Sequence, residues 1–396
     1  MKRYIILLLL SVINICTHAT IPSDSIRVSI VTTGPGSEIW QLEGHAALRV
    51  QIGESVDMAV NYGIFDFKAP YFVYRFVKGE TDYRCEAYPF PYFVNEYVTA
   101  GRWIHEYPIT LEREEAEALL AYLGENLQPQ NAVYRYNYVK DNCATRPVEM
   151  IERALGDTIK FPYNPLPGAI SFRDIMRHYH RNYPWYQFGI DLALGSGIDY
   201  PITKREKIFA PVVLDSMLTT AIRPDGRMLA PTMITLFPGA SGDISSGQTP
   251  WYATPFAVAI YLLVISITIS VHDIRKCQLT RWYDALFMTV TGLTGCVLFF
   301  LVFVSVHEAT SPNWLLIWLN PAALLVPALI FIKKNLPLLF YYEIVNFVAI
   351  LLLSAIWLLT GQSGNAAFIP LAACDAILSA RYIYIYRQCE KKIRKK

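Results

Sequence analysis

The sequence predicts an α+β domain followed by an all-α bundle of five membrane-spanning helices. The chain has 396 residues, more than one domain usually contains. Hydrophobic residues make up 53% of it and charged residues only 17%, a composition typical of membrane proteins. Short strand-like segments come first, and apolar runs long enough to cross a bilayer come last. The formal net charge of +2 gives no reason to expect a nucleic acid partner.

The first 19 residues are predicted to be a cleaved signal peptide. Lys2 and Arg3 precede an apolar stretch at 4–13, and small residues at Thr17 and Ala19 suit a signal peptidase. The alternative is lipidation of Cys16, which the bulky residues at 13–15 disfavour. We therefore expect the following domain, residues 20–223, to be exported.

Within this exported domain, strands are expected before helices. Short β-branched or aromatic runs at 28–33, 46–52 and 58–67 are bounded by turn residues. Residues 111–127 have helical periodicity, 132–139 alternate like a strand, and 144–155 indicate a second helix. Residues 224–253 form the predicted linker, because 224–250 are rich in Pro, Gly and Ser and lack periodicity.

The last predicted domain, residues 254–396, contains five apolar runs. They lie at 254–271, 284–304, 314–332, 341–360 and 366–384. The first four approach the roughly 20 residues that a membrane-spanning helix needs. The fifth is interrupted by Asp375 and Arg381. Asp375 is either a functional residue within the membrane or the structural partner of Arg381, and the sequence leaves both open.

Basic residues predict how these spans are oriented. Arg275, Lys276 and Arg281 follow the first run, Lys333 and Lys334 follow the third, and the C-terminal tail is basic. No Lys or Arg lies between the second and third runs, and residues 361–365 are uncharged. The positive-inside rule then places the tail in the cytoplasm and the exported domain outside. An odd number of spans is required, so five is consistent, and the inner (cytoplasmic) membrane is the expected location.

Cys143 is the predicted nucleophile of the exported domain. It lies in the segment YNYVKDNCATRP (136–147), where a strand runs through a polar turn into a helix. Pro147 must fall in the first turn of that helix, which puts Cys143 at or just before its start. A helix N-terminus and a nearby imidazolium both lower the pKa of a thiol. Free backbone amides there are expected to stabilise an oxyanion.

His45 is the predicted base. It heads a strand in the small-residue segment GHAALRV (44–50), whereas His105 lies among large apolar residues and His178 and His180 lie in a basic stretch. A third polar group should orient the imidazole. Asn61 on the next strand is the first candidate for that role, and Asp66 is the second.

Residues around the cysteine are the predicted substrate contacts. Arg146 is suited to a phosphate or carboxylate of the substrate, although pairing with Glu149 or Glu43 is the alternative. Asp141 or Asn142 is expected to cap the helix. The predicted substrate-binding residues are Arg146, Asn142, Asp141 and Tyr138.

Two further observations leave alternatives open. The exported domain has only Cys85 and Cys143, so a structural disulfide between them competes with the nucleophile hypothesis. Aromatic residues are dense in 71–93, which suits either an apolar site near the bilayer or an ordinary core. The scattered histidines and cysteines lack ligand spacing, so neither a metal nor another cofactor is predicted.

These motifs resemble those of known proteins. A histidine on an early strand and a cysteine at a later helix start resemble the permuted NlpC-type papain-like group. The segments GHAALR (44–49) and YNYVKDNCATR (136–146) are similar to those of the Lnb family, which joins an N-terminal periplasmic domain to a C-terminal transmembrane domain. Residues 185–209 also look like the later part of that periplasmic domain. The resemblance implies a papain-like α+β fold for the exported domain.

The Lnb resemblance also implies a function, lipoprotein N-acylation. The family's cysteine and histidine correspond to Cys143 and His45. An acyl chain would pass from a membrane phospholipid, through a thioester, to the α-amino group of a diacylated lipoprotein. A membrane-anchored peptidoglycan hydrolase and a non-enzymatic scaffold with a Cys85–Cys143 disulfide are the alternatives.

Overall fold

The computed structural model describes residues 26–240, 249–332 and 336–395, so the predicted signal peptide at 1–19 lies outside the described residues. The chain divides into two compact units. Unit 1 contains the described residues through Tyr179 and those from Pro201 to Ala240, and unit 2 contains His180–Tyr200 and the described residues from 249 onward. Part of the segment that looks like the end of the exported domain, 185–209, therefore belongs to unit 2.

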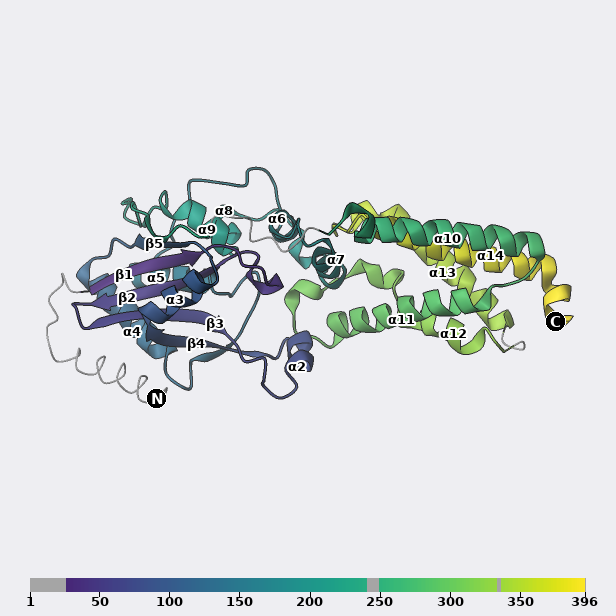
Figure 1. Cartoon of the computed structure of the whole chain (residues 1–396), viewed down its shortest axis with the longest axis horizontal. Coiled ribbons are helices and arrows are strands. Elements are labelled where there is room, and N and C mark those ends of the chain that lie inside the picture. The colour runs from purple at the N-terminus through teal and green to yellow at the C-terminus, as the bar shows by residue number, and fades with distance from the viewer. Residues whose placement is uncertain (1–25, 241–248, 333–335, 396) are drawn as a thin grey trace. The chain divides into compact units, whose positions relative to one another are not determined.

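Unit 1 is built on one antiparallel sheet. Its strands lie in the order β6-β4-β3-β2-β1-β5-β7, and the central five can be followed side by side in Figure 1. The strands are β1 Ile26–Thr33, β2 His45–Ile52, β3 Val56–Ile64, β4 Asp82–Pro89, β5 Ile104–Pro108, β6 Val133–Arg135 and β7 Ile234–Phe237. The helices of this unit are α2 Phe72–Lys78, α3 Phe90–Thr99, α4 Arg113–Asn126, α5 Thr145–Leu155, α6 Phe172–Tyr179, α8 Lys204–Lys207 and α9 Pro211–Leu218. This arrangement confirms a domain of sheet plus helices.

Alternation along the strands decides which helices cover which face of the sheet. Val31 and Ala47 point to the face that Phe93 of α3 covers. Their chain neighbours, such as Ile30 and Leu48, are completely buried on the opposite face, where α4 and α9 contact β1 and α5 contacts β2. Because side chains alternate with a period of two, both faces of the central strands are covered.

The predicted strand at 132–139 is shorter than expected. Only Val133–Arg135 pairs with β4. The side chain of Asn137 accepts hydrogen bonds from the backbone N–H groups of Val139 and Lys140, both at 3.2 Å. This local turn competes with strand pairing, so the chain leaves the sheet before it reaches Cys143.

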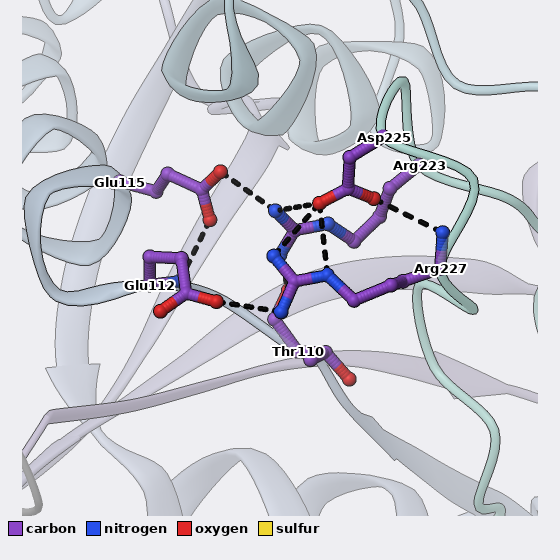
Figure 2. A network of polar contacts seen from close by, with 6 residues as sticks. All are labelled: Thr110, Glu112, Glu115, Arg223, Asp225 and Arg227. Carbon is purple, nitrogen blue, oxygen red and sulfur yellow. Dashed lines mark hydrogen bonds and ion pairs between the residues drawn. The ribbon is translucent and has the colours of Figure 1, made fainter.

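The predicted linker at 224–253 also differs from the structure, because it contains β7, which pairs with β5. An ion-pair network, shown in Figure 2, holds its start against the N-terminus of α4. Arg223 lies 2.7 Å from Glu115, and Arg227 lies 2.6 Å from Glu112 and 2.7 Å from Asp225. Four apolar or β-branched residues are too few for periodicity to reveal this edge strand.

Unit 2 has four helices that are long and apolar enough to cross a membrane, counted over the described residues. They are α10 Pro255–Lys276, α11 Arg281–Phe303, α13 Leu336–Ile356 with its 3-10 extension Trp357–Leu359, and α14 Phe368–Lys395. A shorter helix, α7 Pro184–Ala193, belongs to the same unit. Helix α14 contacts both α10 and α13.

The predicted third span, 314–332, is not one continuous helix. It consists of two 3-10 helices, Trp314–Ile317 and Pro321–Leu324, followed by α12, Leu325–Leu329. Pro321 begins a new helix here, because proline lacks the N–H group and clashes with a preceding turn. A Cβ atom on Gly295 of α11 would lie 2.4 Å from the carbonyl carbon of Asn320. The small residues Gly292 and Gly295 of α11 thus let the broken segment approach closely.

This broken segment connects two distant parts of unit 2. At its start, the side chain of Gln362, which lies just before α14, donates to that of Asn313 at 3.0 Å. Near its end, Ile330 belongs to an apolar cluster with Leu336, at the start of α13, and Tyr382, late in α14. The segment therefore runs alongside the long helices from one end of unit 2 toward the other.

Candidate active site

His45 is the first residue of β2, as predicted. The preceding residue, Gly44, allows the tight backbone turn that leads into this strand. Gly44 has a φ of +82°, a conformation that costs glycine little. A Cβ atom at this position would lie 2.4 Å from the carbonyl oxygen of Thr33. The imidazole stacks on Tyr97 of α3, with ring centroids 6.1 Å apart. The fold thus holds His45 at the end of β2, on the face that α3 covers.

The imidazole is oriented by Asn61 of β3. His45 Nε2 lies 2.7 Å from Oδ1 of Asn61, and Nδ2 of Asn61 donates to the hydroxyl oxygen of Tyr88 at 3.0 Å. Since an amide oxygen only accepts hydrogen bonds, Nε2 carries the proton, and the neutral ring then has its lone pair on Nδ1. Asp66, the other candidate for this role, instead accepts from the backbone N–H of Lys68 in an exposed turn.

Cys143 immediately precedes the N-cap residue of α5, and Asn142 holds it there. Oδ1 of Asn142 accepts from the backbone N–H groups of Ala144 and Thr145 at 2.8 and 3.0 Å. Its Nδ2 donates to the carbonyl oxygens of Tyr138 and Phe209, each at 2.8 Å. The prediction that Asp141 or Asn142 serves this helix start is confirmed for Asn142. The same contacts occupy the backbone amides of Ala144 and Thr145, two of those predicted to stabilise an oxyanion.

The sulfur of Cys143 lies where β2 and β3 diverge. The β2–β3 register ends at the pair Leu48–Val60, two residues beyond Ala46. The backbone N–H of Ala46 forms a hydrogen bond to the sulfur instead, and the hydroxyl of Tyr136 forms another. A Cβ atom on Gly63 of β3 would lie 3.7 Å from the Cβ of Cys143. The residue next to His45 in sequence is thus in direct contact with the predicted nucleophile.

Burial keeps both groups neutral at rest. Burial lowers the pKa of His45 to about 4, against the opposing effect of the Asn61 hydrogen bond. Burial likewise raises the pKa of Cys143 to about 11, although the Ala46 and Tyr136 hydrogen bonds act in the other direction. The expected lowering of the thiol pKa by a helix N-terminus is therefore outweighed by desolvation. This environment favours a neutral thiol and a neutral imidazole over a preformed ion pair.

The predicted substrate contacts are engaged with one another or with the fold. Arg146 forms two hydrogen bonds to Asp141, and its guanidinium carbon lies 3.7 Å from the ring centroid of Tyr134. Neither predicted alternative, Glu149 or Glu43, is its partner in these contacts. The hydroxyl of Tyr138 donates to Glu43 at 2.5 Å. Substrate binding by Arg146, Asn142, Asp141 and Tyr138 remains a prediction.

The remaining cysteine and histidines of interest lie elsewhere. Cys85 and Cys143 are both free and buried, so the alternative disulfide is not formed in the structure. His105 pairs with Asp215 at 3.0 Å. His180, in unit 2, lies 2.9 Å from Gln187.

Three contributors to the site were not predicted from the sequence: Tyr136, the Ala46 amide and Tyr88. Tyr136 lies in the cysteine segment, yet nothing in its spacing indicates a hydrogen bond to the sulfur. The backbone N–H of Ala46 can bond to the Cys143 sulfur only because β2 and β3 separate at this point. Tyr88, which bonds to Asn61, lies on β4, far from either motif in sequence.

Comparison with known protein families gives two matches. The model of the Lnb N-terminal periplasmic domain matches residues 16–167, and the model of the Lnb transmembrane domain matches residues 247–392. The first match contains His45, Asn61 and Cys143. Searches of curated proteins and of solved structures each found no match to this chain.

Proposed function

Because the chain belongs to the Lnb family, we propose that it is a lipoprotein N-acyltransferase with Cys143 as its nucleophile. The observation that carries the proposal is the Asn61-oriented His45 beside the backbone that contacts the Cys143 sulfur. The donor is a membrane phospholipid. The acceptor is the α-amino group of the diacylglyceryl-cysteine at the N-terminus of a lipoprotein. Unit 1 adopts a papain-like arrangement of the permuted NlpC type.

The first half of the reaction forms a thioester. Nδ1 of His45 takes the thiol proton as the sulfur attacks the ester carbonyl carbon of the phospholipid. The backbone N–H groups of Ala46 and Cys143 donate to the resulting oxyanion. When the carbon–oxygen ester bond breaks, the imidazolium returns its proton to the leaving oxygen. Lysophospholipid departs, and Cys143 holds the acyl chain.

The second half transfers the acyl chain to nitrogen. The neutral α-amino group attacks the thioester carbonyl carbon and loses a proton to His45. The carbon–sulfur bond then breaks, and the sulfur leaves with that proton, which restores the thiol. An α-amino group has a pKa near 8, so a useful fraction is neutral at physiological pH. Water would give hydrolysis instead, and the 8% exposure of Cys143 supports its exclusion.

The proposed topology places unit 1 in the periplasm and the basic C-terminus in the cytoplasm, across the inner membrane. Four long helices alone would put both on the same side. We therefore propose that residues 314–332 complete a fifth crossing as a broken helix. The hydrogen bond from the backbone N–H of Trp314 to Gln362 at the start, and the packing of Ile330 with Leu336 and Tyr382 near the end, support this assignment.

The test is the intact mass of purified protein after incubation with phospholipid and no acceptor. Wild type is expected to gain one acyl chain that hydroxylamine removes, whereas Cys143→Ala gains none. Cys85→Ala is the matched control, a second buried thiol that should leave the adduct unchanged. Adding a diacylated lipopeptide should then discharge the thioester and yield a triacylated product. No adduct on wild type would contradict the proposal and favour a hydrolase or a scaffold.

A further inference from the structure

A series of aromatic rings runs from the predicted nucleophile to the surface of unit 1. Tyr136 hydrogen-bonds to the Cys143 sulfur, and its ring stacks on that of Tyr83 with centroids 4.4 Å apart. Tyr83 lies 5.2 Å from Phe65. Phe65 in turn lies 5.8 Å from Phe72 at the start of α2. Each ring in this series thus contacts the next.

The series ends in a group of exposed aromatic side chains. Phe67 contacts Phe65, Phe72 and Trp40, at centroid distances of 4.6, 5.1 and 5.4 Å. Exposure rises along the series, from 9% at Tyr83 to 56% at Phe67, and the neighbouring Tyr71, just before α2, is 83% exposed. Helix α2, which the structure describes in full, has no buried residue. We call the rings of Tyr136, Tyr83, Phe65, Phe67 and Phe72 the ring series.

An ordinary core does not account for this distribution. The other end of the same aromatic stretch behaves as core, because Phe90 and Phe93 of α3 are buried against the sheet. Tyr71, Phe67 and Val73 instead expose most of their surface. Exposed aromatic residues that continue inward to a site are typical of a surface that binds an apolar ligand.

We propose that the ring series binds the acyl chain of the phospholipid donor, with its exposed end in contact with the outer surface of the bilayer. This inference rests on the proposed function, which requires an ester carbonyl at Cys143 and an acyl chain leading away from it. The chain carries four candidate membrane spans, so unit 1 is tethered to a lipid surface. Trp and Tyr side chains, such as the exposed Trp40 and Tyr71, are enriched at the membrane–water interface. The exposed Lys68, next to Phe67, suits the lipid phosphates there.

The proposal predicts that the ring series determines preference for acyl length. A long chain contacts rings far from Cys143, whereas a short chain reaches only Tyr136 and Tyr83. Phe67→Ser removes a distant ring from the exposed end. We expect it to reduce the ratio of thioester formation rates, dipalmitoyl over dihexanoyl phospholipid, by about tenfold relative to wild type. Tyr92→Ser, which removes an aromatic ring 69% exposed on α3, is the matched control and should leave the ratio unchanged.

A binding measurement separates this inference from the proposed function. The full-length Cys143→Ala protein is reconstituted with a phospholipid that carries a photoreactive diazirine on its acyl chain. Illumination is expected to label peptides that contain Phe65, Phe67 or Phe72, and Phe67→Ser in this background should weaken the label. Label confined to the spans of unit 2, or a rate ratio unchanged in Phe67→Ser, would overturn the inference. If wild type forms no thioester, the proposed function fails, while the labelling still decides the inference.

Discussion

Buried polar residues of the two units use asparagine and aromatic partners in different ways. In unit 1, Asn61 joins the neutral groups His45 and Tyr88. In unit 2, Asn346 donates to Asp375 at 2.7 Å, and Trp318 donates to the same carboxyl group at 3.0 Å.

Charge is arranged differently as well. In unit 2, Arg381 pairs with Asp273 and Asp284, and all three side chains are almost completely buried. Asp375, which the sequence left open as the partner of Arg381, binds Trp318 and Asn346 instead. Buried ion pairs resist separation, because an unpaired charge in an apolar environment is costly. A neutral thiol and a neutral imidazole, like those of Cys143 and His45, can instead transfer a proton from one to the other. This difference supports the proposed catalytic role of the unit 1 cluster and a structural role for the Arg381 cluster.

The largest effect is expected from His45→Gln. Removing the base should slow thioester formation by about 10²–10⁴-fold. Thermal stability of the protein should change little, since glutamine still fills part of the space and can bond to Asn61. The rate is measured by intact mass over time. A variant that loses both activity and stability would indicate a structural role for His45.

Arg381→Met tests the charged cluster of Arg381, Asp273 and Asp284 in unit 2. It leaves Asp273 and Asp284 buried without their cation, which should destabilise unit 2 by about 3–5 kcal/mol. The fraction of protein that stays monodisperse after heating in detergent measures the loss. The triple variant Arg381→Met, Asp273→Asn, Asp284→Asn removes all three charges and should recover most of the stability. Equal stability of the single variant and wild type would contradict the assigned role.

The protonation state of Cys143 tests whether the unit 1 site is neutral, in contrast to the charged Arg381 cluster of unit 2. With a thiol pKa of about 11, the thiolate fraction rises with pH throughout the neutral range. Alkylation of Cys143 by iodoacetamide should therefore accelerate about tenfold per pH unit, roughly 100-fold between pH 7 and 9. Cys143→Ala supplies the background from other thiols. A rate that levels off near pH 7 would instead indicate a thiolate–imidazolium pair, as in the charged cluster of unit 2.

The smallest effect is expected at Asn61, which acts through His45. Asn61→Ala should reduce the rate about tenfold, in keeping with the loss of one orienting hydrogen bond. That bond favours the protonated imidazole, so losing it should lower the pKa of His45 from about 4. The acid limb of the pH–rate profile should then move to lower pH. Asn61→Asp adds a negative charge near His45 and should move the limb upward. Shifts in the same direction for both variants would exclude this role.

Local patterns predicted several parts of the site correctly. Pro147 and the polar turn at 141–142 placed Cys143 at a helix start, and α5 begins two residues later, at Thr145. Gly44 preceded a β-branched and apolar run, and β2 begins at His45. The neighbouring strand supplied Asn61. Each of these predictions depends on residues close in sequence, where backbone sterics and periodicity act.

Other features depended on contacts that the sequence does not encode locally. Desolvation set the pKa values of His45 and Cys143, and it depends on the whole surrounding core. The third apolar run has the length and composition of a span, yet Pro321 and close contact with α11 divide it. The aromatic stretch 71–93 divides into core and surface only after α3 has packed on the sheet.

The sequence by itself therefore determined the two-part organisation, the long apolar helices and the local settings of Cys143 and His45. These follow from hydropathy, helix capping and strand alternation, which act over a few residues. Only the tertiary structure decided that the thiol stays protonated, that the Ala46 amide and Tyr136 contact its sulfur, and that a ring series leads from it to the surface. Those properties arise from contacts between segments that are distant in sequence. Such contacts decide which groups are shielded from water, and this shielding sets the pKa of the thiol.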